Sequence, residues 1–205
     1  MQLLPTLTYP DGTTVWLWQM DEDAPQLAAL CHDWGIDIHD TTHLAAKRQR
    51  EVLATRLLLH TAGINAPLTH DDNGAPRIAG SDLHVSISHT ASMVCLAVNP
   101  QHPIGVDVER CDRQQVLRVR HKFLNASEQT FIPADDLFMH IIAWTAKEAI
   151  IKLSHHRDID WTHDIRLHPF TVANSNPIEI TATYHTTPCH LLSQICNNHI
   201  VTLAW

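Results

Sequence analysis

The chain has 205 residues, of which 44% are hydrophobic and 18% are charged, values typical of a globular protein with a buried core. Its formal net charge of −8 argues against a general nucleic-acid binder or a protein of anionic membrane surfaces, and no apolar run is long enough to predict a membrane span. The opening residues lack the pattern of a signal peptide, and five scattered cysteines without a C-x-x-C spacing indicate reduced thiols and a cytoplasmic protein.

The first half of the chain predicts a hairpin, two helices and a run of short strands. Pro10-Asp11-Gly12 is a strong turn signal between two β-prone runs. The expected elements are a hairpin over 1–19, helices over 23–33 and 42–62, and strands near 67–71, 76–78, 84–88, 93–98 and 104–108. For the longer helix we expect Asp40, Thr41 or Thr42 as the cap and Gly63 as the stop.

The second half predicts helices followed by alternating strands. The expected elements are helices over 113–124, 127–132 and 136–153, and strands over 178–184, 191–196 and 199–205. Each half therefore offers a helix and an antiparallel sheet. We expect an α+β fold of two similar halves, 1–104 and 105–205, although the sequence shows no clean internal repeat.

A first chemical signal lies on the strand that joins the halves, Ile104–Glu109. Side chains alternate along a strand, so Asp107 and Glu109 project to one face while Val106 and Val108 face the core. Two neighbouring carboxylates repel each other, and a hard divalent cation such as Mg²⁺ relieves that repulsion. The alternative is a solvent-exposed strand face carrying two ordinary acids.

A second signal lies on the last predicted helix. Trp144, Glu148 and Lys152 stand at i, i+4 and i+8, which places them on one stripe. Such a stripe is consistent with a common surface ion pair. The functional interpretation makes Glu148 a third carboxylate and Lys152 a charge that meets a phosphate.

A third signal lies near the end of an earlier strand. Alternation puts Ser86 and Ser88 on one face, and His89 follows at the strand end, where functional residues are common. A single histidine at such a place can equally be structural.

Taken together in this order, S-I-S-H, then G-V-D-V-E, then W-x-x-K-E-A-x-x-K resemble the Sfp-type 4′-phosphopantetheinyl transferases. The resemblance runs from about Arg48 to Phe170 and includes Phe123-Leu124-x-x-x-Glu128. It implies two α+β halves with coenzyme A in the cleft between them, and a monomer, because one chain supplies both sides. The implied reaction moves phosphopantetheine from coenzyme A to a serine of an apo acyl or peptidyl carrier protein and releases 3′,5′-ADP.

The resemblance also implies roles for particular residues. Asp107, Glu109 and Glu148 would hold Mg²⁺ against the pyrophosphate of coenzyme A. Glu148 would act as the general base toward the carrier serine, with a metal-bound water as the alternative proton relay. Lys152 would neutralise or protonate the leaving phosphate, and Ser88 and His89 would lie at the pyrophosphate.

Several basic residues complete the expected coenzyme A site. Arg50 and Arg56 match the family's basic helix beside the nucleotide phosphates, and Arg48 is a candidate to join them. The family usually carries a phosphate-binding lysine where this chain has Ala75, so Arg77 substitutes only if its strand lets it turn inward. The basic stretch 113–122 would face an acidic carrier.

Three other functions stay open at this point. The chain could keep the fold but have lost or changed the reaction, since the usual lysine is missing. It could be a module that binds a carrier protein without catalysis. A different Mg²⁺-dependent phosphoryl or nucleotide hydrolase ranks last, because no glycine-rich phosphate loop is present.

Overall fold

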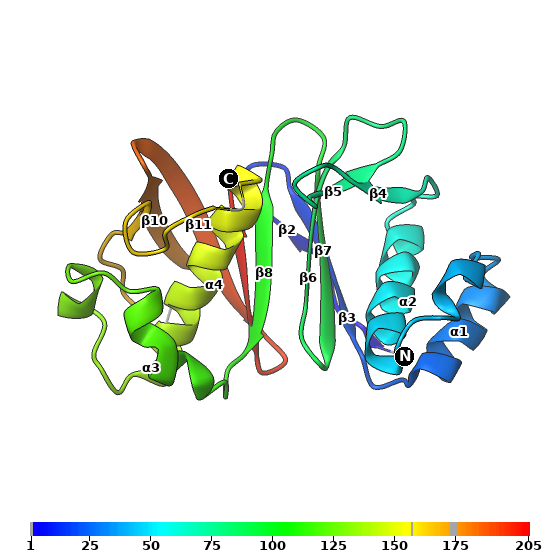
Figure 1. Cartoon of the computed structure of the whole chain (residues 1–205), viewed down its shortest axis with the longest axis horizontal. Helices are drawn as coiled ribbons and strands as arrows, with labels where there is room; N and C mark the ends of the chain where they lie inside the picture. Colours follow the sequence, from blue (N-terminus) through cyan, green and yellow to red (C-terminus); the bar gives the residue numbers. More distant parts are fainter. Residues whose placement is uncertain (1, 157, 173–175) are drawn as a thin grey trace.

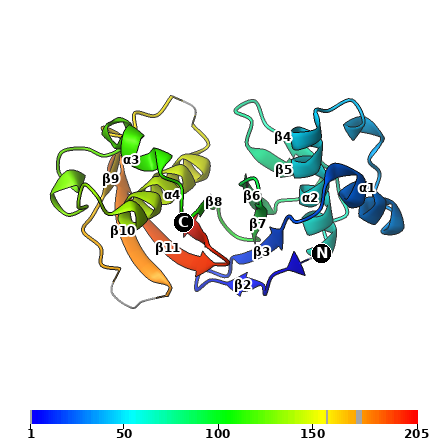
Figure 2. The same ribbon diagram turned by 90° about the horizontal axis from the view of Figure 1, so that it is seen from below.

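The computed structural model describes residues 2–156, 158–172 and 176–205 and has two antiparallel sheets side by side. In Figure 1 the N-terminal half, in blue to green, lies on the right, and the C-terminal half, in green to red, lies on the left. Seen from below, the helices of both halves lie on the same side of the sheets, with β6 and β8 between them (Figure 2). No helix in these ranges combines the length and apolar character that a membrane crossing requires.

The first sheet carries the N-terminal half. Its strands follow the order β1-β3-β7-β6-β5-β4, with β2 paired to β3. Their bounds are β1 Gln2–Leu3, β2 Leu7–Thr8, β3 Thr14–Gln19, β4 Leu68–His70, β5 Pro76–Ile78, β6 His84–His89 and β7 Met93–Asn99. The helices of this half are α1 Ala24–Asp33, the short 3-10 turn η1 His39–Thr41 and α2 Ala46–Thr61.

The second sheet carries the C-terminal half in the order β8-β12-β11-β10-β9. Its strands are β8 Gly105–Arg110, β9 Ile165–Leu167, β10 Ile178–Tyr184, β11 Thr187–Cys196 and β12 His199–Ala204. Three short segments precede the long helix, namely α3 Gln115–Val119, η2 Arg120–Lys122 and η3 Glu128–Thr130. The helix α4 spans Leu137–Ser154, and Asp136 is its N-cap: the Asp136 side chain accepts a hydrogen bond from Met139 N.

Each half has its own core, and a third core lies where the two sheets meet. The third one unites side chains of β3 and β7 with side chains of β8, β11 and β12, including Val15, Met93, Val106, Val108 and Leu203. Burial of this shared apolar surface fixes the two sheets against each other. The cleft between the halves therefore has rigid walls.

Serine side chains of β6 connect the first sheet to β8 of the second. The Ser86 hydroxyl accepts a hydrogen bond from Val106 N at 2.9 Å, and the Ser88 hydroxyl accepts one from Val108 N at 3.3 Å. These bonds take the place of a backbone ladder between β6 and β8, which run side by side in the same direction (Figure 1). The predicted common face of the two serines is confirmed.

Gly105 allows α4 to lie directly on β8. A Cβ atom added to Gly105 would clash with the backbone carbonyl of Ala149 and would come within 2.6 Å of Leu153 N. Backbone atoms cannot rotate away, so we expect Gly105→Ala to destabilise the fold by at least about 1–3 kcal/mol. Chemical denaturation of Gly105→Ala and the wild type measures this loss. Equal stability of the Gly105→Ala variant and the wild type would contradict the close approach.

The predicted α+β class is confirmed, and most predicted elements lie within a few residues of the observed ones. The predicted start of the longer helix is wrong: α2 begins at Ala46, and Ala45 at the N-cap position provides no side-chain cap. Asp40 lies in η1 and pairs with Arg56. The predicted helices over 113–124 and 127–132 are short α or 3-10 turns, and β9 was not expected from the sequence.

Candidate functional site

Asp107 lies on β8, next to β6 of the other half, and is only 5% exposed. Its Oδ1 accepts hydrogen bonds from the Ser88 hydroxyl at 2.7 Å and from Lys152 Nζ at 2.8 Å. Lys152 also donates to the carbonyl of Val106 at 3.0 Å. The other carboxylate oxygen of Asp107, Oδ2, is buried and has no hydrogen-bond partner among the described residues. A buried, unpartnered carboxylate oxygen is costly unless a ligand binds it, which makes this atom a candidate ligand-binding atom.

Glu148 lies on α4 and faces the same carboxylate. Burial first, and then the negative charge of Asp107, raise the pKa of Glu148 above its ordinary value. Lys152 and Arg113 lower that pKa but do not cancel the two effects. Glu148 and Lys152 of the expected stripe therefore both lie near Asp107.

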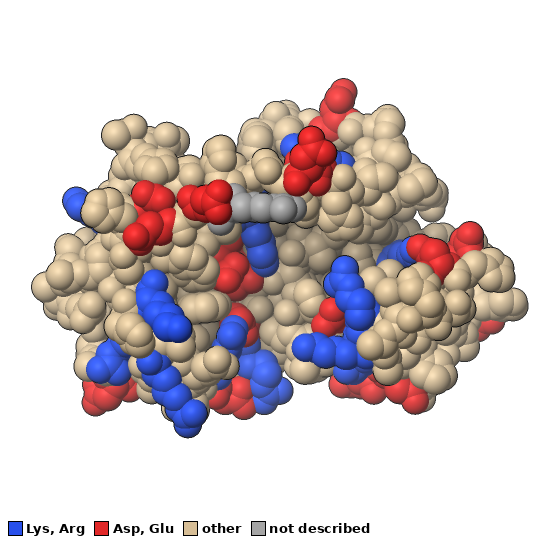
Figure 3. Space-filling model, viewed as in Figure 1, with Lys and Arg blue, Asp and Glu red and all other residues tan. Residues whose placement is uncertain are grey.

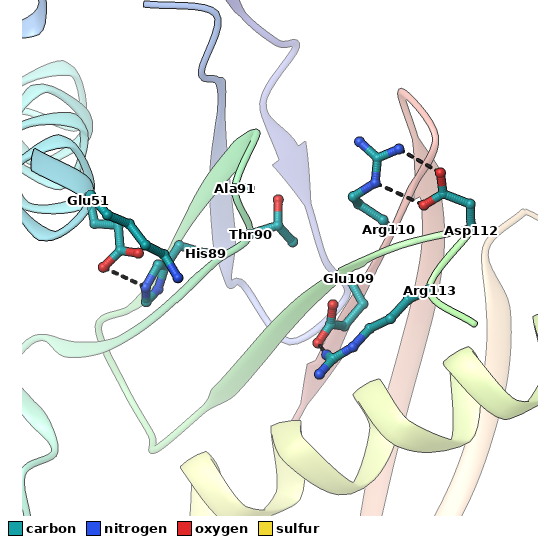
Figure 4. Close-up of a pocket in the computed structure, with 9 residues that line it drawn as sticks. Glu51, His89, Thr90, Ala91, Glu109, Arg110, Asp112 and Arg113 are labelled. Carbon is teal, nitrogen blue, oxygen red and sulfur yellow. Dashed lines mark hydrogen bonds and ion pairs between the residues drawn. The ribbon is translucent and has the colours of Figure 1, made fainter. Parts of the chain in front are cut away.

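Glu109, the third predicted metal ligand, is held by an ion pair with Arg113, four residues further along the chain. The guanidinium carbon of Arg113 also lies 5.1 Å from the ring centre of Trp144, a cation–π contact. Figure 4 shows Glu109 and Arg113 turned toward each other on the β8 side of the cleft. In this arrangement the Glu109 carboxylate is occupied by the Arg113 guanidinium.

The opposite wall is formed by β6 and α2. His89 Nε2 lies 2.9 Å from Glu51 Oε2, and Arg48 Nη1 lies 3.3 Å from the same oxygen. Figure 4 shows Glu51 and His89 across the cleft from Glu109 and Arg113. A cleft of about 400 Å³ lies between these walls and is also lined by Lys47 and Arg110. The predicted His89 therefore shares one cleft with the residues around Glu109.

Exposed cations surround the lower end of this cleft. Figure 3 shows Lys and Arg side chains gathered along the lower part of the face in both halves. The exposed members from the first turn of α2 and from α3 and η2 are Lys47, Arg48, Arg118, Arg120 and Lys122. The protein as a whole is acidic, so this grouping creates a local field that attracts anions.

Two arginines that the resemblance assigned to the nucleotide phosphates make other contacts. Arg50 donates hydrogen bonds to the carbonyls of Glu22 at 2.6 Å and Ala91 at 2.9 Å, and it also donates to Met20. Arg56 forms a two-pronged ion pair with Asp40, at 2.7 and 2.8 Å. Both side chains thus connect α2 to neighbouring segments, whereas Arg48 faces the cleft side through Glu51.

Arg77 lies on β5. It is exposed and pairs with Asp71 at 3.2 Å within the β4–β5 hairpin. Burial, and then the positive charge of Arg77, lower the pKa of His155 at the end of α4, so the hairpin approaches the opposite half. Arg77 thus forms its ion pair within its own hairpin.

The residues fit a divalent cation in part. Asp107 and Glu148 supply oxygen ligands of the type that Mg²⁺ prefers, and the unpartnered Asp107 Oδ2 offers a ready first contact. Glu109 does not join them while it pairs with Arg113. Accordingly, the described residues contain no group of three or more His, Cys, Asp or Glu side chains arranged for a metal ion.

Lys147 and Glu128 form a completely buried ion pair at 2.8 Å. Lys147 Nζ also donates to the carbonyls of Trp161 and Ile165, while Glu128 accepts from Leu167 N and Asn125 N. Burial is the main cause that lowers the pKa of Lys147. This network anchors α4 to β9 and η3, and it fixes the backbone next to Glu148.

Sequence reasoning missed Glu51, Arg113 and the Lys147–Glu128 pair. Lys147 stands inside the W-x-x-K-E-A-x-x-K motif, and Glu51 stands between Arg50 and Arg56, but neither gave a chemical signal of its own. Arg113 was expected only as a member of a basic stretch. Its i, i+4 spacing from Glu109 was the available clue.

Residues 103–204 match the family model described as the 4′-phosphopantetheinyl transferase superfamily. The matched segment begins just before β8 and includes Asp107, Glu109, Glu148 and Lys152, but not the wall formed by β6 and α2. No curated protein matches the chain.

Proposed function

We propose that this protein, whose C-terminal half matches the 4′-phosphopantetheinyl transferase superfamily, transfers phosphopantetheine from coenzyme A to a serine of an apo acyl or peptidyl carrier protein. The observation that carries the proposal is the Asp107 cluster. There a serine, a lysine and an unpartnered carboxylate oxygen meet beside Glu148, whose pKa is raised. The products are the modified carrier and 3′,5′-ADP.

In this proposal the two halves supply opposite sides of the coenzyme A site. Residues 1–104 contribute Ser88 and His89 at the pyrophosphate, and residues 105–205 contribute the carboxylates and Lys152. Cations line the cleft between them, which suits a ligand that carries several phosphate charges. One chain provides both walls, so a monomer suffices for the reaction.

Mg²⁺ held by Asp107 and Glu148, with Glu109 when it leaves Arg113, would supply charge neutralisation at the pyrophosphate. Lys152 lies 2.8 Å from Asp107 Oδ1 and can meet the departing phosphate oxygen with its positive charge. Ser88 holds the other side of the same carboxylate and so fixes its orientation.

Glu148 is our choice for the general base. A serine hydroxyl is a weak nucleophile at neutral pH and needs a nearby base in the transition state. A carboxylate whose pKa is raised by burial holds a proton more readily than an exposed one, which suits it for that step. The bond that forms joins the carrier serine oxygen to the β-phosphorus, and the bond that breaks joins that phosphorus to the bridging oxygen of 3′,5′-ADP.

The carrier would approach the lower end of the cleft. The exposed cations of α2, α3 and η2 surround that end, and carrier domains are typically acidic. Complementary charge of this kind raises the association rate, and added salt weakens this acceleration.

Calorimetry with coenzyme A and Mg²⁺ tests whether the cleft is the coenzyme site. We expect His89→Ala to weaken binding by roughly tenfold, the effect of losing about one charge-assisted hydrogen bond. Arg56→Gln is the matched control, because its guanidinium is already paired with Asp40 outside the cleft. Equal losses in both variants, or none in His89→Ala, would contradict this assignment.

A further inference from the structure

Glu109 and Arg113 form an ion pair at the place where the proposed cation site would need a third carboxylate. Arg113 is held there twice, by the carboxylate of Glu109 and by the face of the Trp144 ring at 5.1 Å. The pair is half-buried, with 32% of the Arg113 side chain and 16% of the Glu109 side chain exposed. It lines the same cleft as Lys47 and His89.

The charges of the cleft explain why an internal cation is needed. Asp107 and Glu109 lie on β8 and Glu148 lies on α4, and the negative charge of Asp107 acts on Glu148. Lys152 neutralises Asp107, and Arg113 neutralises Glu109. Arg113 also lowers the pKa of Glu148, so its charge is felt by a second carboxylate of the same set.

We infer that Arg113 is an internal counterion that competes with the divalent cation for Glu109, so that cation binding draws Glu109 away and releases the Arg113 guanidinium into the cleft. This inference rests on the proposed function for the identity of the cation site. It adds a residue that sets the cation affinity of this chain through Glu109, without itself being a metal ligand.

Two consequences follow from this competition. The cation must break the Glu109–Arg113 pair before Glu109 can bind it, so the pair lowers cation affinity. The released guanidinium then adds one positive charge to a cleft that Lys47 and Arg110 already line. Cation binding thus makes the cleft more attractive to an anion than the cation charge alone would.

The test measures Mn²⁺ binding to the full-length chain without coenzyme A. Electron paramagnetic resonance gives the concentration of free Mn²⁺ at each total concentration. We expect Arg113→Gln to tighten Mn²⁺ binding by roughly twofold to fivefold, the range of a partly exposed ion pair. Arg113→Lys, which keeps the charge beside Glu109, should stay close to the wild type. Arg118→Gln removes one charge from the same basic stretch at an exposed position and should leave Mn²⁺ affinity unchanged.

A double-mutant comparison separates competition for Glu109 from a general charge effect. In a Glu109→Gln background, Arg113→Gln should no longer change Mn²⁺ affinity. The same gain with and without Glu109, a gain equal to that of Arg118→Gln, or no gain at all would overturn the inference. Thermal unfolding of each variant checks that the fold is retained.

The inference and the proposed function fail in different ways. If the wild type binds Mn²⁺ and Arg113→Gln does not alter that affinity, only the role of Arg113 is overturned. If the wild type and Arg113→Gln both fail to bind Mn²⁺, the cation site itself is overturned, and the inference with it.

Discussion

Glu148→Gln is expected to reduce the rate of phosphopantetheine transfer by about 10²–10⁴-fold, the usual contribution of a positioned general base. Glutamine keeps the size and shape of the side chain but cannot accept the serine proton. Steady-state kinetics with coenzyme A and an apo carrier measures the change. Glu179→Gln, an exposed acid on β10, is a matched control and should keep the wild-type rate. A Glu148→Gln variant with wild-type activity would remove Glu148 from the chemistry.

The same variant should be more stable than the wild type at neutral pH when no divalent cation is present. The folded-state pKa of Glu148 is raised by burial and by Asp107, so folding favours the protonated carboxyl. The stability from this preference is fully present below the unfolded pKa and is lost as pH rises through the folded pKa. Glutamine resembles the protonated form at every pH.

The stability gain of Glu148→Gln should therefore grow from acidic to mildly alkaline pH. Thermal unfolding of both proteins in the presence of a chelator, across that range, measures the difference. A gain that stays constant with pH would show that ionisation of Glu148 is not its cause. Together with the kinetic loss, a pH-dependent gain would indicate that the chain trades stability for function at this position.

Lys147→Met is expected to destabilise the fold by about 3–5 kcal/mol, because it leaves the Glu128 carboxylate buried without its cation. Both side chains are completely buried, so water cannot replace the lost partner. Chemical denaturation measures the loss. Lys122→Met, at an exposed position in η2, is the matched control and should change stability by less than about 0.5 kcal/mol.

The double variant Lys147→Met/Glu128→Met separates an unpaired buried charge from lost packing. We expect it to recover much of the stability that the single variant loses, since both charges then leave the interior. A double variant whose loss of unfolding free energy equals the sum of the losses in the two single variants would contradict this explanation. It would instead show that the backbone groups around Lys147 and Glu128 depend on both side chains.

Much of the fold was predictable because its strands alternate clearly and its turns carry strong signals. The strands β5 and β10 have the predicted bounds, and the helix predicted over 136–153 agrees with α4 to within one residue at each end. The start of α2 was not predictable, because Ala45 and Ala46 carry no capping side chain and Asp40 pairs with Arg56 sixteen residues further along. The strand β9 has three residues, as β5 does, but it has no preceding turn signal like the Asn73-Gly74 pair before β5.

The candidate site was predictable only in its local part. The alternation of β8 correctly separated Asp107 from the buried Val106 and Val108, and the spacing on α4 correctly placed Glu148 and Lys152 on one stripe. Contacts that depend on the folded chain were not predictable. Arg50, for example, uses its donors on backbone carbonyls far away in the sequence, a role that its basic character does not reveal.

Intact-mass spectrometry of carrier proteins tests the central claim most directly. Apo acyl and apo peptidyl carriers are incubated with this protein, coenzyme A and Mg²⁺, and parallel reactions contain a chelator or the Asp107→Asn variant. The account predicts that at least one carrier gains the mass of a single phosphopantetheine group, and that the gain is lost in both parallel reactions. Unmodified carriers of both kinds, with a protein that binds coenzyme A and the carrier, would contradict it and favour a carrier-binding module without transferase activity.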